Sequence, residues 1–179
     1  ANRVNLFNDH LFVKEPGTTK SRVPWHQDQP YCAVDGQQFC SVWAPLDPIP
    51  QESTVEFILG SHLWERWFAP FDAMRDGAVH GSQELELAPD FEAERDAHAI
   101  ASWTLKPGDC LAFHALTLHQ GMANPTMTTR RRAVIGRYLG DDAVYVEREP
   151  RSVFPHQAPP LSNGEPLSNA PDDFPPVWP

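Results

Sequence analysis

The chain has few residues that crosslink a fold, cross a membrane or carry positive charge. Of its 179 residues only 3 are cysteines, and Cys32, Cys40 and Cys110 are too scattered for a disulfide framework. We expect them to be small core residues of a protein in the reducing cytoplasm. No apolar run approaches membrane-spanning length, and the first residues contain no apolar stretch of a signal peptide. We therefore expect no membrane partner.

Basic residues are also scarce. The chain has 14 Lys and Arg against 24 Asp and Glu, a formal net charge of −10. Such a balance argues against a basic nucleic-acid-binding surface, so we expect no nucleic-acid partner. The hydrophobic content of 41% and the chain length suit one ordinary globular domain. The oligomeric state is not set by these numbers.

Long helical patterns are absent, and short apolar runs broken by Gly, Pro and Asp predominate. This pattern predicts an all-β sandwich or barrel with a few short helices in loops. In Lys106-Pro107-Gly108-Asp109 the Pro-Gly pair predicts a type II turn. We expect a helical turn at 64–68, and surface loops or short helices at 71–81 and 89–98. The predicted strands are 4–7, 10–13, 39–46, 54–59, 100–105, 109–118 and 131–139.

Proline is abundant instead, with 19 residues that crowd the chain after Glu149. We predict a core at 1–148 and a Pro-rich C-terminal extension at 149–179 that follows the surface as extended coil. The extension either packs Phe154, Phe174 and Trp178 onto the barrel or serves as a polyproline-like segment that binds a partner.

The most informative motif is His26-Gln27-Asp28, with His119 far downstream. Residues i and i+2 of a strand face the same side, so His26 and Asp28 can hold one edge of a metal. A closed sandwich can bring His119 beside them. Two imidazoles and one carboxylate are the ligand set of non-heme iron(II) oxygenases, which leaves coordination positions open.

A cosubstrate such as 2-oxoglutarate would need a fixed cation for its far carboxylate, and arginine suits that role. The cluster Arg130, Arg131 and Arg132 follows His119 on the next predicted strand. One of the three could point inward, and at most one is expected to be functional. We expect His114 to be a packed strand residue. The tryptophans expected in the core are Trp25, Trp43 and Trp103.

An ordered set of segments between about Leu11 and about Asp142 resembles the phytanoyl-CoA dioxygenase family of iron(II)/2-oxoglutarate oxygenases. The segments are LFVKEPGT, PWHQDQPY, CSVWAPLD, TVEFILGSH, KPGDCLAFHALTLHQG and RRAVIGRYLGDD. The resemblance implies a double-stranded β-helix (jelly-roll, cupin-like) fold, an enzyme that uses Fe(II), 2-oxoglutarate and O2, and Trp43 against the cosubstrate. It implies His26, Asp28 and His119 as the iron ligands. Because relatives carry a helical N-terminal segment, we expect that it is missing here.

The resemblance leaves the cosubstrate residues open. The usual family spacing selects Arg130, whereas the strand register selects Arg131, which we favour. Relatives commonly follow the distal histidine with Gly-Ser, but here Gln120-Gly121 follows His119. A hydroxyl from Thr126 or Thr128 would have to substitute, or none does.

The reaction predicted by the resemblance is hydroxylation of an unidentified small molecule. Related halogenases lack the carboxylate ligand, so the presence of Asp28 favours hydroxylation. Lys14, His62 and Trp64 are the candidate substrate residues. The alternatives are a non-catalytic metal-binding jelly roll, or degenerate family member, and a structural module that acts through its Pro-rich tail.

Overall fold

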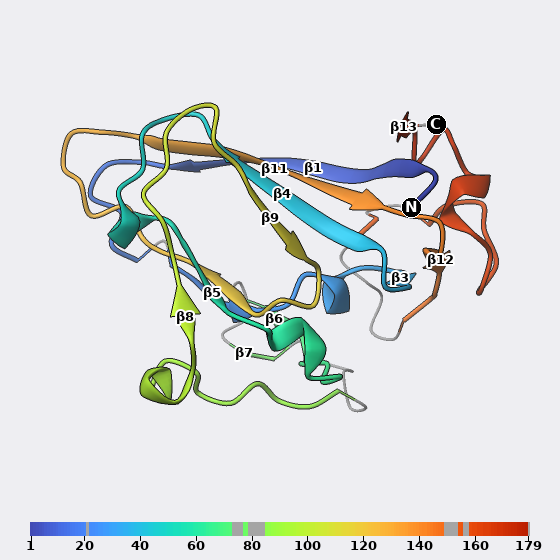
Figure 1. Ribbon diagram of the computed structural model, residues 1–179, viewed down its shortest axis with the longest axis horizontal. Helices are drawn as coiled ribbons and strands as arrows, with labels where there is room; N and C mark the ends of the chain where they lie inside the picture. Colours follow the sequence, from blue (N-terminus) through green and yellow to red (C-terminus); the bar gives the residue numbers. More distant parts are fainter. Residues whose placement is uncertain (21, 73–76, 79–84, 149–153, 156–157, 179) are drawn as a thin grey trace.

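Two facing antiparallel sheets form the body of the protein (Figure 1). The computed structural model describes residues 1–20, 22–72, 77–78, 85–148, 154–155 and 158–178. The larger sheet has five strands in the order β13-β1-β11-β4-β9, and the smaller has four in the order β2-β10-β5-β8. The larger sheet comprises β1 (Val4–Lys14), β4 (Phe39–Pro45), β9 (Leu111–His114), β11 (Arg131–Leu139) and β13 (Pro176–Trp178). The smaller comprises β2 (Val23–His26), β5 (Val55–Ile58), β8 (Ile100–Ala101) and β10 (His119–Gly121).

The remaining elements are short. Two small pairs join β3 (Val34–Asp35) to β12 (Val144–Tyr145) and β6 (Phe71–Asp72) to β7 (Gly77–Ala78). The described residues contain no α-helix. No helix among them is long and apolar enough to span a membrane. The predicted all-β jelly roll with short helices in loops is therefore confirmed. The 3-10 helices are η1 (Gln29–Tyr31), η2 (Gln51–Ser53), η3 (Ser61–Leu63), η4 (Arg95–Ala97) and η5 (Leu167–Asn169).

The core between the two sheets follows from strand alternation. In β11 the side chains of Arg131, Ala133, Ile135 and Arg137 share one face, and all four are buried. Ala133 and Ile135 belong to a cluster of buried apolar residues from both sheets, which also contains Trp43, Ile49, Val55, Phe57, Leu105 and Phe113. The two arginines at either end of this row lie at the borders of that cluster and need polar partners.

A corner between β9 and β10 carries the chain from the larger sheet to the smaller one (Figure 1). The sequence predicted one strand at 109–118, but residues 115–118 form a turn in which Thr117 N–H donates to the His114 carbonyl. Ala115, which is fully buried, accepts hydrogen bonds from the N–H groups of Asp28 and Gln29. The corner therefore fixes the chain after β2 next to the start of β10.

Several other strand predictions need correction. The runs 4–7 and 10–13 form one strand, β1, with an irregularity in its pairing between Leu6 and Asn8. The predicted strand at 100–105 is only the two-residue β8. The helical turn lies at Ser61–Leu63 rather than 64–68, because Gly60 adopts the left-handed conformation (φ 77°) that starts it. Part of the 71–81 prediction lies outside the described residues.

Three burial predictions are also wrong. Cys40 and Cys110 are exposed, and only Cys32 is a core residue. Trp103 is 45% exposed, whereas Trp25 and Trp43 are buried as expected.

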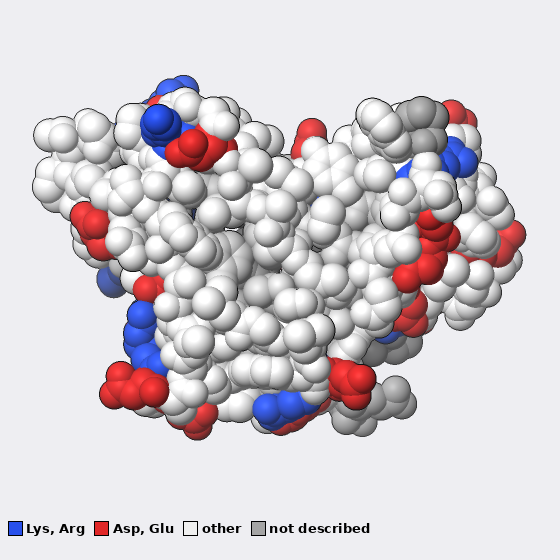
Figure 2. Space-filling view, viewed as in Figure 1, with Lys and Arg blue, Asp and Glu red and all other residues white. Residues whose placement is uncertain are grey.

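On the face seen in Figure 2, Lys and Arg lie beside acidic groups around the edge, and the centre is uncharged.

The C-terminal segment contributes to the core. Phe174 is 1% exposed and its ring stacks on that of Phe7 with centroids 5.6 Å apart. Leu167 and Ala170 join the same cluster, while Trp178, at the edge strand β13, is 64% exposed. The expectation that Trp178 packs onto the barrel is wrong. The division into a core at 1–148 and an extension at 149–179 remains a prediction.

Replacing Phe174 with Ala is expected to lower the free energy of unfolding by about 3–5 kcal/mol, because it leaves a cavity beneath the C-terminal segment. Trp178→Ala is the matched control and should cost no more than about 0.5 kcal/mol, since its side chain is exposed. Urea unfolding of both variants measures the difference. Equal losses would contradict the assignment of Phe174 to the core.

Candidate metal centre

Three side chains with metal-binding atoms converge between the two sheets. One ligand atom each from His26, Asp28 and His119 lies within 4.8 Å of the others. Asp28 Oδ1 is 3.8 Å from His26 Nε2 and 3.9 Å from His119 Nε2. Among the described residues this is the one group of three or more such side chains. The structure thus brings together the three residues that the sequence singled out.

The two histidines are cross-strand neighbours. His26 at the end of β2 pairs directly with His119 at the start of β10, and the ring centroids are 4.1 Å apart. Each Nδ1 lies beside a backbone carbonyl, that of Pro24 at 2.8 Å and that of Thr117 at 2.9 Å. A carbonyl only accepts, so each Nδ1 must carry the proton and each Nε2 presents its lone pair to the centre.

Burial keeps both imidazoles neutral. The pKa of His119 falls to about 3, because burial removes solvation from the charged ring and His26 stands beside it. Burial also lowers the pKa of His26, for the same reason. Neutral imidazoles are the form that binds a metal, so no proton has to be displaced from Nε2 near neutral pH.

Asp28 reaches the site by a route that the sequence did not predict. Strand β2 ends at His26, and Asp28 has helical dihedral angles (φ −73°, ψ −42°) at the start of η1. Simple strand alternation is therefore not what aligns Asp28 with His26. The hydrogen bonds to the Ala115 carbonyl hold the turn, and Gln27 points elsewhere, to the backbone of Arg66, Phe68 and Leu116.

Arg137 contacts the candidate metal ligand Asp28, and the sequence did not predict this. It is buried, and its Nη2 donates to Asp28 Oδ1 at 2.8 Å, while Ser41 donates to Oδ2 at 2.6 Å. Burial alone would raise the pKa of the Asp28 carboxyl, but the Arg137 guanidinium outweighs burial and holds that pKa well below its usual value. The alternation that puts Arg131 inward also puts Arg137 inward, which was the available signal.

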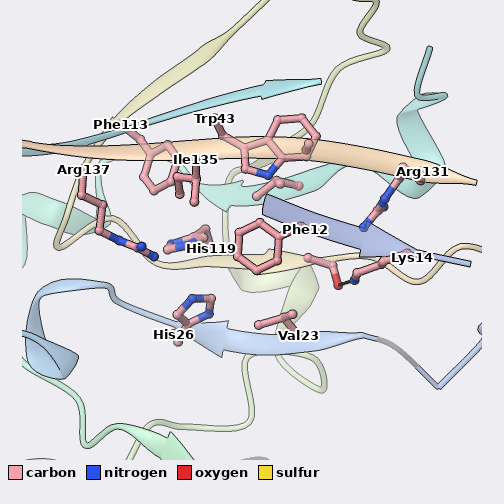
Figure 3. A pocket seen from close by; sticks show the side chains of 13 residues that line it. Phe12, Lys14, Val23, His26, Trp43, Phe113, His119, Arg131, Ile135 and Arg137 are labelled. Atoms are coloured by element: carbon pink, nitrogen blue, oxygen red, sulfur yellow. Dashed lines mark hydrogen bonds between the residues drawn. The ribbon is translucent and has the colours of Figure 1, made fainter. Parts of the chain in front are cut away.

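Two cationic side chains lie at the far end of the cavity that borders the histidines (Figure 3). Lys14 and Arg131 are directly opposite each other on β1 and β11, and both are buried. Burial and the neighbouring Arg131 lower the pKa of Lys14 to about 7, and burial lowers that of Arg131 to about 10. Like charges placed opposite each other destabilise a sheet, so this pair has a cost that an anion would offset.

Of the other two cosubstrate candidates, one lines this cavity and one lies on the surface. Trp43 lines the same cavity as Arg131. Arg130 is exposed and pairs with Glu15 at 2.9 Å on the surface. Lys14 lies with Arg131 at the end of the cavity away from the histidines (Figure 3).

Two of the predicted substrate residues lie elsewhere. His62 stacks on His114 with ring centroids 5.5 Å apart, and Trp64 packs near Phe91 and His98. Neither His62 nor Trp64 lines the two described cavities that reach the histidines. The structure does not bring these two residues to the metal-binding group.

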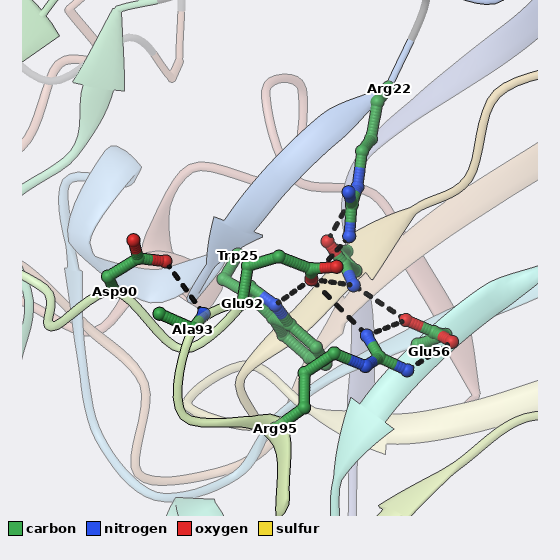
Figure 4. A network of polar contacts seen from close by, with 8 residues as sticks. Arg22, Trp25, Glu56, Asp90, Glu92, Ala93 and Arg95 are labelled. Carbon is green, nitrogen blue, oxygen red and sulfur yellow. Dashed lines mark hydrogen bonds and ion pairs between the residues drawn. The ribbon is translucent and has the colours of Figure 1, made fainter.

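Gln120 stands where relatives commonly have a glycine after the distal histidine, and the structure explains this difference. Its side chain accepts from Arg22 and donates to Glu56 and Glu92, three residues of the polar network labelled in Figure 4. Neighbouring residues of a strand face opposite sides, so Gln120 points away from the side of β10 that carries His119. Gly121, one residue on, lines the cavity. Thr126 hydrogen-bonds within its own loop and Thr128 is exposed, so neither supplies the expected hydroxyl.

Facing antiparallel sheets around two histidines and a carboxylate define the double-stranded β-helix architecture of iron-dependent oxygenases. Residues 1–133 match the sequence family described as Phytanoyl-CoA dioxygenase (PhyH), which is most of the chain. The chain belongs to this family. It is 26% identical over 152 residues to a probable phytanoyl-CoA dioxygenase of Caenorhabditis elegans, a match that covers 77% of this chain and 44% of that protein. It thus spans less than half the length of this curated relative.

Solved structures share the fold. The non-heme alpha ketoglutarate dependent carbocyclase SnoK from nogalamycin biosynthesis superposes with a TM-score of 0.69 at 23% identity, covering 98% of this chain and 62% of that one. The epimerase SnoN from the same biosynthesis gives 0.67 at 22% identity, covering 98% and 63%. At this identity the likeness establishes the fold alone.

Arg137→Met is expected to lower the free energy of unfolding of the metal-free protein by about 3–5 kcal/mol, because Asp28 becomes a buried carboxylate without its partner. Saturating Ni(II) should reduce the difference in unfolding free energy between Arg137→Met and the unchanged protein, since a divalent ion replaces the lost positive charge beside Asp28.

The matched control is Arg132→Met on the same strand, which removes a solvent-exposed ion pair with Asp47. It should destabilise the protein far less than Arg137→Met and show no dependence on Ni(II) beyond that of the unchanged protein, since exposed ion pairs contribute little. Thermal unfolding with and without metal measures all three proteins. A metal-independent deficit in Arg137→Met would contradict the coupling between Arg137 and the metal-binding group.

Proposed function

We propose that this chain is an Fe(II)/2-oxoglutarate-dependent dioxygenase domain that hydroxylates a small organic molecule. The observation that carries the proposal is the convergence of His26, Asp28 and His119 beside a cavity whose far end holds Lys14 and Arg131. A set of two neutral imidazoles and one carboxylate suits iron(II) and leaves coordination positions open. The fold-related SnoN is described in complex with Fe3+, alpha ketoglutarate and nogalamycin RO.

The metal would be held by Nε2 of both histidines and by Asp28 Oδ1. Backbone carbonyls fix the tautomer of each histidine, and Ser41 and Arg137 fix the carboxylate. Iron(II) with 2-oxoglutarate and O2 supplies the oxidising power, and the overall reaction converts C–H to C–OH with release of succinate and CO2. The protein contributes the geometry of the ligands and the cationic end of the cavity that would hold the cosubstrate.

The cosubstrate would place its far carboxylate between Lys14 and Arg131. Nη1 of Arg131 is buried and has no hydrogen-bond partner, which is costly unless a ligand supplies an acceptor. A carboxylate there would accept from Arg131 and offset the repulsion from Lys14. Trp43, also in the lining, offers a flat wall to the ligand. Arg131 rather than Arg130 is our choice of cosubstrate arginine.

Hydroxylation is the reaction that the retained carboxylate favours. With Asp28 as a ligand, the position that a halide would take in a halogenase is filled. SnoN and SnoK are described as an epimerase and a carbocyclase, so related folds also support other oxidative outcomes. Identification of the product by mass spectrometry, as substrate plus one oxygen, would support hydroxylation over these outcomes.

A non-catalytic metal-binding jelly roll is the competing function. It would need the three ligands but would have no use for two buried, adjacent cations at the end of the neighbouring cavity. Lys14 Nζ donates to the carbonyls of Gly121 and Met122, but Arg131 Nη1 is buried without a partner and faces a like charge, so a purely structural role leaves the burial of Arg131 unexplained. This arrangement favours the oxygenase.

Anaerobic titration with Fe(II) and 2-oxoglutarate should produce the weak visible charge-transfer band of the chelate. His119→Ala should abolish the band, since one of three ligands is lost. Arg131→Ala should weaken 2-oxoglutarate binding by about 10- to 100-fold, the worth of a hydrogen bond to a charged group. Arg130→Ala is the control and should bind like the unchanged protein, because Arg130 is on the surface.

Iron binding without any 2-oxoglutarate band would favour the non-catalytic metal-binding protein and overturn the oxygenase. A loss in Arg130→Ala that matches the loss in Arg131→Ala would overturn the choice between the two arginines.

The affinity for 2-oxoglutarate should fall as pH rises above about 7. In the ligand-free protein the pKa of Lys14 is lowered to about 7, so above this pH Lys14 is mostly neutral and must take up a proton to meet the anion. The fall is at most about tenfold per pH unit, for one proton linked to binding. Calorimetry from pH 6 to 9 should show this slope in the unchanged protein and a flat profile in Lys14→Met. Equal slopes in both proteins would contradict the role of Lys14.

A further inference from the structure

A second cavity also borders the metal-binding group. It holds about 720 Å³ of empty space, including the part open to solvent, and the lining includes His26, Asp28 and Arg137. Phe12, Val23, His26 and Arg137 line both cavities, so the metal-binding group lies where the two meet. If the first cavity takes the cosubstrate, the second is the space left beside the metal for the molecule that reacts.

The charges in this cavity already balance. Among its described lining residues only Asp28 and Arg137 carry formal charge, and they form a buried ion pair with 2.8 Å between Oδ1 and Nη2. Arg137 Nη1 also donates to Asn8 Oδ1 and toward His10 Nδ1, whereas its Nε is buried without a hydrogen-bond partner. Lys14 and Arg131 lie at the opposite end of the first cavity (Figure 3). A charged group on a ligand would lose its hydration here without gaining an unpaired counter-charge.

The walls are aromatic and come from three separate segments. Phe12 lies on β1, Tyr31 in η1 and Phe154 in the C-terminal segment. The Phe154 ring lies 4.9 Å from that of His10, and the Tyr31 ring stands perpendicular to that of His26 at 5.9 Å. Flat apolar walls with a few polar groups at one end favour an apolar ligand, and rings pack well against rings.

We propose, on the basis of the proposed function, that the second cavity binds an uncharged, mostly apolar substrate that contains a ring, with its reacting carbon toward His26 and Asp28. Coenzyme A thioesters, the substrates that the family name suggests, carry several phosphate charges and need basic partners. The described lining offers one cation, Arg137, which Asp28 already occupies. An acyl-CoA is therefore the competing substrate class that the experiment must distinguish.

The test compares a matched pair of probes, neutral 2-acetylnaphthalene and anionic 2-naphthoate, together with octanoyl-CoA. Binding is measured by calorimetry, first with the metal-free chain and then with the anaerobic Fe(II)/2-oxoglutarate complex. The neutral probe should bind at least about tenfold more tightly than either anion in both states. Tighter binding of 2-naphthoate or octanoyl-CoA, or no binding of the neutral probe, would overturn the proposal.

Three substitutions test whether the neutral probe binds in the second cavity. Phe154→Ala and, separately, Phe12→Ala should each weaken the neutral probe by about tenfold or more, whereas Trp178→Ala, an exposed aromatic in the C-terminal segment, should leave it unchanged. Two variants in different segments guard against a folding defect in one. Loss in Trp178→Ala equal to that in Phe154→Ala and Phe12→Ala would contradict the site.

The chelate band keeps this proposal separate from the proposed function. A chelate that forms without selective binding of the neutral probe rejects the substrate class alone. If the neutral probe binds selectively to the metal-free chain but no chelate forms, the oxygenase is rejected. The second cavity would then not be a catalytic substrate site.

Discussion

The buried ion pair between Asp28 and Arg137 is the interaction on which the site depends. A carboxylate that is 3% exposed is tolerated only with a nearby positive charge and full hydrogen bonding. Arg137 supplies the charge from β11, and Ser41 supplies a hydroxyl from β4. Both strands belong to the larger sheet, whereas His26 and His119 belong to the smaller one. The pair therefore joins the sheets at the point where the ligand atoms converge.

The two cavities differ in charge, and this difference suits them to different ligands. One ends at Lys14 and Arg131, where positive charge exceeds negative charge and an anion would be favoured. The other contains a neutralised pair and aromatic walls, where an anion would be unfavourable. The metal-binding group lies between them, so an anionic cosubstrate and an uncharged substrate can approach the same ion without competing for one space.

Much of this arrangement could be predicted from the sequence, because strand alternation and the His-x-Asp motif are local signals. The β11 prediction was right, and its alternation put Arg131 inward. The split of run 109–118 was missed because residues 115–118 are Ala-Leu-Thr-Leu, with no Gly or Pro to mark the corner. Arg137 was missed because its partner belongs to another element, and the direction of Gln120 depends on a network with segments distant in sequence.

The central claim is that His26, Asp28 and His119 together bind the metal, and diffraction tests it most directly. Crystals grown anaerobically with Fe(II) and 2-oxoglutarate, measured at the iron absorption edge, would locate the ion. The account predicts one anomalous peak in contact with Nε2 of both histidines and with Asp28 Oδ1, and cosubstrate density that extends toward Arg131. A peak at other side chains, or an Asp28 carboxylate that stays on Arg137 and does not contact the ion, would contradict it.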